Sequence, residues 1–239
     1  MGRGFEKRKH KMFARYDKMA KLFTKFGKEI AIAVKASGPD PDSNGRLRTA
    51  IQNAKGVNMP KDRIDAAIKR ASSKDNKDDF EEVVYEGYCP HAVAIIIETA
   101  TNNPTRTVAN LRSYLNKGGG AMGKMGSLDF VFSRKGVFTL EVKGMDIESL
   151  ELELIDFGLE EIEMEGDEAI IITAFEDFSR MQKALEEKNI HIINAELERI
   201  PTSFADVSGD AIEEIHDLVA KIEQDDDVQS VYINMREIE

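Results

Sequence analysis

The segment from Gly136 to Ile200 restricts the fold more than any other part of the sequence, because strand-like and helix-like runs alternate in one order. Short runs rich in Val, Ile and Thr predict strands, and runs with apolar residues three or four positions apart predict helices. In chain order, the six segments are GVFTLEV, DIESLELELIDFG, EEIEME, EAIIITA, DFSRMQKALEEKN and IHIINAELERI. This βαββαβ order predicts a ferredoxin-like sandwich, with two helices on one face of a four-stranded antiparallel sheet.

A second α/β domain is predicted around this one. VVYEGY, HAVAIIIETAT and SLDFVF predict strands, and NNPTRTVANLRSYLNKGGG predicts a helix between the last two. These segments lack a final helix and strand, which DAIEEIHDLVAKIEQ and VQSVYINM near the end of the chain would supply. We therefore expect residues 80–134 and 204–239 to form one α/β domain, with residues 135–203 inserted into it as a ferredoxin-like domain.

The first 79 residues predict a basic domain of three helices. Residues 12–36 form one long amphipathic pattern, and GRLRTAIQNAKG follows with Asp42 or Ser43 as its N-cap. A third helix begins near Pro60, after the turn GVNMP. The predicted fold class is therefore α+β: an N-terminal three-helix domain followed by two ferredoxin-like sandwiches, one inserted in the other.

Charge is divided unevenly along the chain. Residues 1–74 hold 19 Lys and Arg against 7 Asp and Glu, a balance of +12, whereas the remainder has a balance of -23. This asymmetry predicts that the first segment meets a polyanion, while the acidic remainder keeps the protein soluble. The alternative is that the basic and acidic domains attract one another.

The cations of the N-terminal domain are the candidate nucleic-acid contacts. Along residues 12–36 they gather opposite the apolar face, with few acids to neutralise them, and two further helices joined by a short turn add a second basic surface that resembles a helix-turn-helix. The candidates are Lys7, Arg8, Lys9, Lys11, Arg15, Lys18, Lys21, Lys25, Lys28, Arg46, Arg48, Lys55, Lys61, Arg63, Lys69 and Arg70.

The glycine-rich stretch GGGAMGKMGS approaches the pattern of a phosphate-binding loop, with Gly118, Gly123 and Lys124 at the required spacing. Met125 stands where that pattern needs a hydroxyl, and the loop follows a helix, whereas a phosphate-binding loop precedes one. We therefore expect no nucleotide hydrolysis. The loop is either a secondary nucleic-acid contact or a connector that needs glycine to turn, and the secondary candidates are Arg106, Arg112, Lys117 and Lys124.

Catalytic and metal-binding patterns are scarce. The four histidines are far apart, the single cysteine, Cys89, has no evident base, and the runs Glu160–Glu165 and Asp225–Asp227 predict solvated surface. A lone cysteine and the absence of a long apolar run favour the cytoplasm, with no membrane partner. We expect no catalytic residue, metal, cofactor or small-molecule substrate.

Two stretches carry a family resemblance: RTAIQNAKGVNMPKDRIDAAIKRA, and the run from YEGYCPHAVAIIIETATNNP to SLDFVF. They resemble the YebC/PmpR family, which includes the mitochondrial translational activator of cytochrome c oxidase. The resemblance covers essentially the whole chain. Its start, MGRGFEKRKHKM, differs from the AGHSKWANIKHRK-like start of many members and resembles another subgroup, although the basic arm is kept.

The family resemblance implies a cytoplasmic, non-enzymatic protein with a role in transcription regulation by DNA binding. Its mitochondrial relatives imply translation regulation through ribosomal RNA instead. The prediction is therefore a nucleic-acid-binding regulator of gene expression, with duplex DNA first and the ribosome or its RNA second. A protein-interaction adaptor working through the acidic domains is a third interpretation, and the sequence leaves the oligomeric state open.

Overall fold

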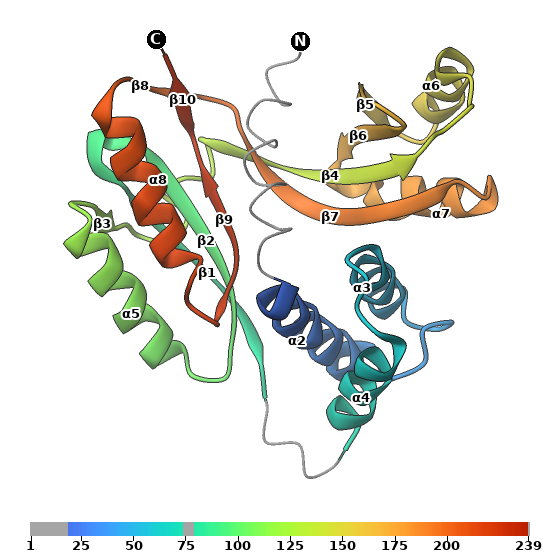
Figure 1. Cartoon of the computed structure of the whole chain (residues 1–239), viewed down its shortest axis with the longest axis horizontal. Helices are drawn as coiled ribbons and strands as arrows, with labels where there is room; N and C mark the ends of the chain where they lie inside the picture. The colour runs from blue at the N-terminus through green and yellow to red at the C-terminus, as the bar shows by residue number, and fades with distance from the viewer. Residues whose placement is uncertain (1–18, 74–78, 239) are drawn as a thin grey trace. The chain divides into compact units, whose positions relative to one another are not determined.

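The computed structural model describes residues 19–73 and 79–238 (Figure 1). The chain divides into two compact units. Unit 1 contains the chain up to Lys69 together with Arg134–Arg199, and unit 2 contains Arg70–Ser133 together with Ile200–Glu239. The described residues have the predicted α+β fold class, with N-terminal helices and two α/β sandwiches, one inserted in the other. The three domain limits expected from the sequence stay a prediction.

The N-terminal helices of the described chain are α2 (Met19–Ser37), α3 (Gly45–Gly56) and α4 (Lys61–Ala71). Helix α3 packs on α2, with Ile30 and Leu47 fully buried. The predicted N-cap at Asp42 or Ser43 is wrong, because Asn44 holds that position. Its Oδ1 accepts the N–H of Leu47 at 3.0 Å, while its Nδ2 donates to the carbonyls of Ala33 and Gly38 at 2.8 Å. An amide can both accept and donate, so Asn44 begins α3 and also fixes the end of α2.

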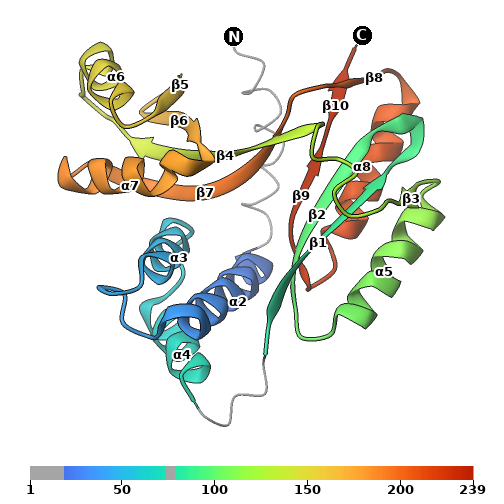
Figure 2. The same cartoon turned by 180° about the vertical axis from the view of Figure 1, so that it is seen from behind.

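The inserted sandwich has the predicted βαββαβ order. Its elements are β4 (Phe132–Glu141), α6 (Ile147–Ile155), β5 (Leu159–Glu165), β6 (Glu168–Ala174), α7 (Phe178–Glu187) and β7 (His191–Pro201), with a short 3-10 turn, η2 (Phe175–Asp177), before α7. The strands lie in the order β5-β6-β4-β7, so β5 and β7 are the two edges (Figure 2). Phe138, Leu140 and Ile171 of the sheet pack against Leu154 and Leu185 of the helices to form the core.

Helix α3 lies against the β7 edge of this sheet, within unit 1. The side chain of Asn53 pairs with the backbone of Ala195 in both directions: Nδ2 donates to the carbonyl at 2.7 Å, and Oδ1 accepts the N–H at 2.8 Å. Gln52 donates to the carbonyl of Ile192, and Gly56 permits a close approach, because a Cβ there would stand 2.1 Å from the carbonyl oxygen of Ile193. Helix α3 therefore covers the edge strand β7.

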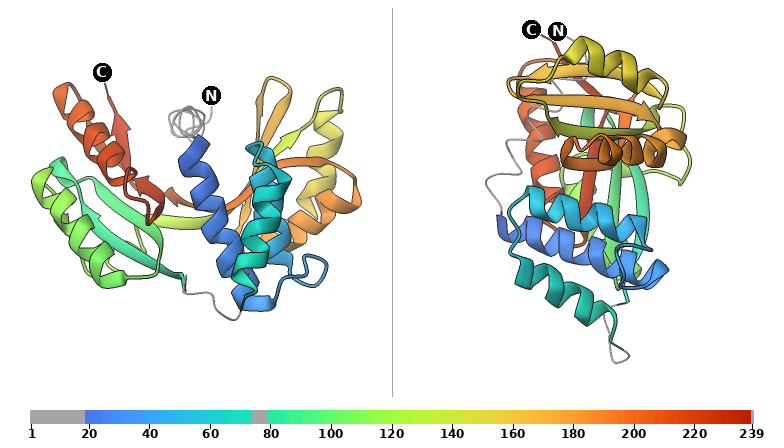
Figure 3. Two further views of the ribbon diagram at one scale, coloured as in Figure 1. Left: turned by 60° about the horizontal axis from the view of Figure 1, so that its bottom comes forward. Right: turned by 90° about the vertical axis from the view of Figure 1, so that its right-hand side faces the viewer.

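Unit 2 contains a second four-stranded sheet, in the order β3-β1-β2-β9, and a parallel pair formed by β8 and β10 (Figure 3). Its elements are β1 (Glu81–Tyr88), η1 (Pro90–Ala92), β2 (Ala94–Thr101), α5 (Pro104–Lys117), β3 (Ala121–Met122), β8 (Ala205–Val207), α8 (Asp210–Ile222), β9 (Val228–Ile233) and β10 (Met235–Glu237). Helices α5 and α8 supply Leu111, Leu115, Ile215 and Leu218 to a core on one face of the sheet.

The prediction of a strand at SLDFVF is wrong. Residues Ser127–Val131 form turns, and only Phe132 begins β4. Leu128, Val131 and Phe132 instead pack on Ala94 and Ile96, covering the second face of the unit 2 sheet. Apolar side chains at positions i, i+3 and i+4 can cover a sheet face from a turn, so burial here outweighs the strand preference of the run.

We predict that Asn53→Ala loosens the contact between α3 and β7. The substitution leaves a buried N–H and a carbonyl without partners, at a cost of about 1–3 kcal/mol each. Amide hydrogen exchange at Ala195 should become faster, whereas Gln52→Ala, which removes one bond to Ile192, should change it less. Unchanged protection of Ala195 in the Asn53→Ala protein would show that the side-chain amide does not hold this edge.

Candidate nucleic-acid interface

Six of the predicted cations lie outside the described residues: Lys7, Arg8, Lys9, Lys11, Arg15 and Lys18. On α2, the structure differs from the expected cationic face at Lys28, whose side chain is buried with 7% of its surface exposed. Lys21 and Lys25 are half-buried, and the Lys25 ammonium stands 3.9 Å from the carboxylate of Glu29. The expectation of a uniformly exposed row along α2 is therefore wrong at Lys28, which we leave out of the interface.

Helices α3 and α4 present their cations to solvent. The exposed set is Arg46, Arg48, Lys55, Lys61, Arg63, Lys69 and Arg70. Helix α3 contains no acidic residue, and α4 sets two aspartates against four cations. Because residues seven apart share a helix face, Arg48 lies above Lys55 and Arg63 above Arg70. Each helix therefore presents a pair of cations on one flank.

Two of these arginines also have partners within unit 1. The Nε of Arg48 stands 3.7 Å from the carboxylate of Glu186, and both side chains are more than a third exposed. Such a pair contributes little stability and opens easily. The guanidinium of Arg63 lies 5.6 Å from the centre of the Phe23 ring, which attaches α4 to α2. Arg63 thus holds α4 in place and also contributes positive charge to the surface of this helix.

Helices α3 and α4 and the short turn between them agree with the helices predicted from the sequence. The turn Val57–Pro60 joins the two helices, and Lys61 and Arg63 lie in the first turn of α4 as expected. One flank of α3 is engaged with β7, and Arg63 is engaged with Phe23. The groups best exposed are long cations suited to phosphate, which position a protein on nucleic acid without reading its sequence.

The glycine-rich loop of unit 2 is closed around a carboxylate of the chain itself. Glu86 is buried at 6% exposure, and its two oxygens accept the N–H of Gly126 at 2.7 Å, the N–H of Leu128 at 2.8 Å and the hydroxyl of Ser127 at 3.1 Å. Backbone N–H groups arranged in this way would hold an anion such as phosphate. Here Glu86 occupies that position, so the loop cannot cradle a phosphate unless the carboxylate leaves.

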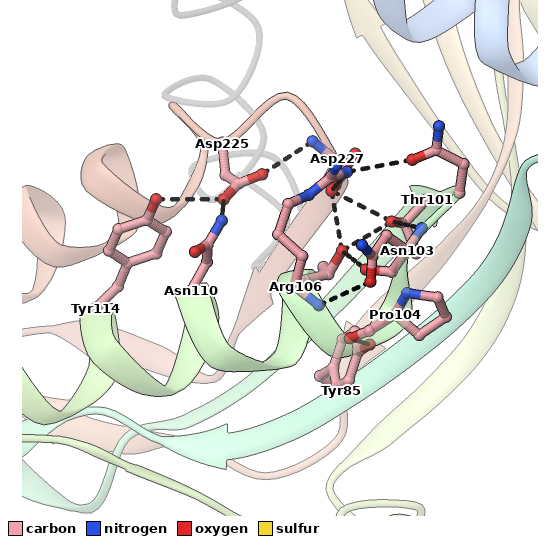
Figure 4. Close-up of polar contacts among 11 residues, drawn as sticks. Tyr85, Thr101, Asn103, Pro104, Arg106, Asn110, Tyr114, Asp225 and Asp227 are labelled. Carbon is pink, nitrogen blue, oxygen red and sulfur yellow. Dashed lines mark hydrogen bonds and ion pairs between the residues drawn. The ribbon is translucent and has the colours of Figure 1, made fainter. Parts of the chain in front are cut away.

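Asp225 and Asp227 near the end of the chain are structural, which corrects the expectation of solvated surface for these two residues, whereas Asp226 between them is exposed (Figure 4). Asp227 is buried and accepts hydrogen bonds from Thr101 at 3.2 Å, Thr107 at 2.9 Å and Arg106 at 2.6 Å. Asp225 accepts from the amide of Asn110 and the hydroxyl of Tyr114 at the next turns of α5. These two aspartates fix α5 beside the turn that precedes β9.

Arg106 therefore has a different role from the secondary phosphate contact expected of it. Its hydrogen bond to Asp227 raises the pKa of the guanidinium, and its charge is balanced by that carboxylate. The other three secondary candidates, Arg112, Lys117 and Lys124, are exposed. Sequence reasoning missed Asp227 and Glu86 because each gathers donors from segments remote in the chain.

The single cysteine is buried, and three of the four histidines lie beside surface glutamates. Cys89 is buried, and burial raises the pKa of its thiol to about 12, so it has little thiolate at neutral pH. His91, His191 and His216 each lie within 3.2 Å of a glutamate on the surface. Across residues 19–73 and 79–238, no three His, Cys, Asp or Glu side chains gather as metal ligands, and no helix in those ranges is long and apolar enough to cross a membrane.

Comparison with known proteins defines the class. Residues 3–74 match the profile described as the TACO1/YebC protein N-terminal domain, and residues 80–235 match the TACO1/YebC second and third domain. The chain belongs to the TACO1/YebC family. A relative from Cytophaga hutchinsonii, named "Probable transcriptional regulatory protein", is 58% identical over the full length of both chains.

Two further comparisons agree with this assignment. A Myxococcus xanthus protein with the same name is 51% identical over 98% of this chain and 100% of its own. Among solved structures, the crystal structure of the conserved hypothetical protein Aq1575 from Aquifex aeolicus matches with a TM-score of 0.81 and 34% identity, covering 93% of this chain and 92% of that one.

We predict that Glu86→Ala frees the glycine-rich loop. The N–H groups of Gly126 and Leu128 lose their acceptor, so trypsin should cleave after the exposed Lys124 faster than in the unchanged protein. Ser127→Ala removes one hydroxyl donor and leaves both N–H contacts, so it should accelerate cleavage less. Equal cleavage rates in all three proteins would mean that Glu86 does not hold the loop.

Proposed function

We propose that the protein is a non-enzymatic, cytoplasmic regulator of gene expression that binds nucleic acid through the exposed cations of α3 and α4. The observation that carries the proposal is the one-signed charge of α3, with Arg46, Arg48 and Lys55 and no acid, beside the four cations of α4. Phosphate groups provide the matching charge, and their counterions are released when lysine and arginine replace them. The names of the relatives support a role in transcription.

Duplex DNA is the first candidate ligand. A pair of helices joined by a short turn can place one helix in a major groove, and α4 begins with Lys61, Asp62 and Arg63. Ribosomal RNA is the second candidate, favoured by the contact of Arg63 with Phe23. The contact keeps the Arg63 side chain against the protein, where it is less able to read bases. This arrangement suits binding through the phosphate backbone and the shape of a folded RNA.

The structure determines how the proposal is best tested. Deleting residues 1–74 would also remove Asn53 and leave the backbone of Ala195 without its partner. Weak binding by such a truncated protein could then come from a damaged sandwich. Substitutions of exposed side chains avoid this difficulty, because surface changes usually alter stability by less than about 0.5 kcal/mol.

We predict that replacing Lys55, Lys61 and Lys69 with Gln lowers the affinity for nucleic acid and also makes this affinity less dependent on salt. The slope of log affinity against log salt should become shallower by up to about 0.9 for each phosphate that the variant no longer neutralises on duplex DNA, and by about 0.7 on single strands. Binding should be measured by fluorescence anisotropy for a DNA duplex and by sedimentation for ribosomes, at several salt concentrations.

The matched control replaces Lys143, Arg180 and Lys183 of the inserted sandwich with Gln. All three are exposed and each pairs with a surface carboxylate, so the change in net charge is the same. The affinity of this control for both ligands, and the slope of log affinity against log salt, should then change little. The proposal is wrong if the two triple variants have the same slope on both ligands, because total charge rather than α3 and α4 would govern binding.

A further inference from the structure

Among the described residues, a helix covers one edge of the inserted sandwich, and no strand pairs with the other edge, which we call open. Helix α3 covers β7 through Asn53, whereas β5 ends the sheet on the other side. Edge strands present unpaired backbone N–H and carbonyl groups, and proteins usually protect them with lysine, proline, bulges or short length. Strand β5 runs for seven residues, Leu159–Glu165, and carries a bulge at its start and glutamates along its length.

The two faces of β5 differ in chemistry. Ile162 and Met164 pair with Ile171 and Ala169 of the core, so they lie on the face that α6 covers, and 45% of Met164 is exposed. Glu161 and Glu165 alternate with them and lie on the opposite face. An added strand would therefore meet an apolar side chain on one face and carboxylates on the other.

Helix α6 extends the apolar face beyond the edge. It packs on β5 with Leu150 and Leu154 buried (Figure 1). Glu153 pairs with Lys188 at the end of α7, so that flank of α6 is turned toward α7. With about 100° per residue, Ile155 lies on the opposite flank and Leu152 on the outer side next to it.

These two side chains are unusually open for their type. Leu152 is 70% exposed and Ile155 is 54% exposed. Glu148 and Glu151 lie on the same side of the helix, so the apolar pair is bordered by carboxylates. Acidic groups repel nucleic acid and an anionic lipid surface, and they also repel a second copy of β5. They attract a cationic segment that has apolar side chains of its own.

We infer that β5 and the outer side of α6 form a docking site for an extended, lysine- or arginine-rich segment of a partner protein, which adds to the sheet beside β5. Its backbone pairs with the open edge of β5, as in other cases of strand addition. Its cations face Glu161 and Glu165, and its apolar side chains lie against Met164, Leu152 and Ile155. This site is separate from the cations of α3 and α4 and does not depend on the proposed function.

The test uses the full chain and a capped eight-residue peptide of alternating lysine and valine. NMR should show shifted and more slowly exchanging amides within Leu159–Glu165 when the peptide is added. A peptide of alternating glutamate and valine should not bind. Comparable affinity for both peptides, or no shift at β5 with the lysine peptide, would overturn the inference.

Peptide methylation separates strand addition from nonspecific attraction between charges. Alternate N–H groups of a strand point to opposite sides, so only one alternating set can donate to β5. One peptide carries methyl groups on the backbone nitrogens of its lysine residues, and a second carries them on the backbone nitrogens of its valine residues. One of the two peptides should lose binding and the other should keep it. If both bind equally, the backbone of β5 is not used and the inference fails.

Protein variants locate the site. The double change Leu152→Ser and Ile155→Ser should weaken peptide binding about tenfold, because it removes two apolar side chains that the peptide would cover. The control Met125→Ser removes a side chain that is 80% exposed in unit 2 and should leave affinity unchanged. Equal effects of the two changes would contradict the placement at α6. Glu161→Gln with Glu165→Gln should also weaken binding, and no effect would exclude the assigned cation contacts.

Discussion

The hydrogen bonds between the Asn53 side chain and the backbone of Ala195 determine how unit 1 is organised. A primary amide has the same donor and acceptor spacing as a strand backbone, so Asn53 can take the place of a neighbouring strand at the β7 edge. Gly56 allows the helix to come close enough for this exchange. The basic helices and the acidic sandwich are thereby one body, with α3 held on one flank and Arg48 and Lys55 left in solvent on another.

This contact also addresses the alternative explanation of the charge asymmetry. If basic helices and acidic sandwich were joined by mutual attraction, charged pairs would carry their interface. Among the described contacts of α3 with β7 and α7, Thr49, Gln52 and Asn53 form hydrogen bonds, and Arg48 and Glu186 lie 3.7 Å apart in a solvent-exposed position. The hydrogen bonds of Thr49, Gln52 and Asn53 are made by uncharged groups, so this contact of α3 with the sandwich does not require attraction between charges.

Much of the architecture follows from sequence periodicity. The six segments of the inserted sandwich were predictable because strand and helix periods alternate there with short connections, and the two outlying segments at the end of the chain were needed to complete the second sheet. The strand at SLDFVF was predicted wrongly because a run of apolar residues indicates that the segment is buried but does not indicate its backbone conformation. These residues form turns that cover one face of a sheet.

Sequence periodicity could not have predicted the polar side chains that join distant segments of the chain. Asn53 and Ala195 are 142 positions apart, and Asp227 meets Thr107 across 120 positions, so neither pair leaves a local pattern. Lys28 and Glu86 are charged and buried, against the usual tendency of their residue types. Cations on α3 and α4 were correctly expected to be exposed, because a helix with an apolar stripe turns its charged face to water.

Lysine footprinting of the complex tests most directly whether α3 and α4 contact phosphate. The full chain, free and bound to duplex DNA or to ribosomes, is acetylated briefly and the modified sites are read by mass spectrometry. If α3 and α4 contact phosphate, Lys55, Lys61 and Lys69 are modified more slowly in the bound protein, and modification of Lys143 and Lys183 is unchanged. Protection of Lys143 and Lys183 while the three helix lysines stay fully reactive, on both ligands, would contradict this contact.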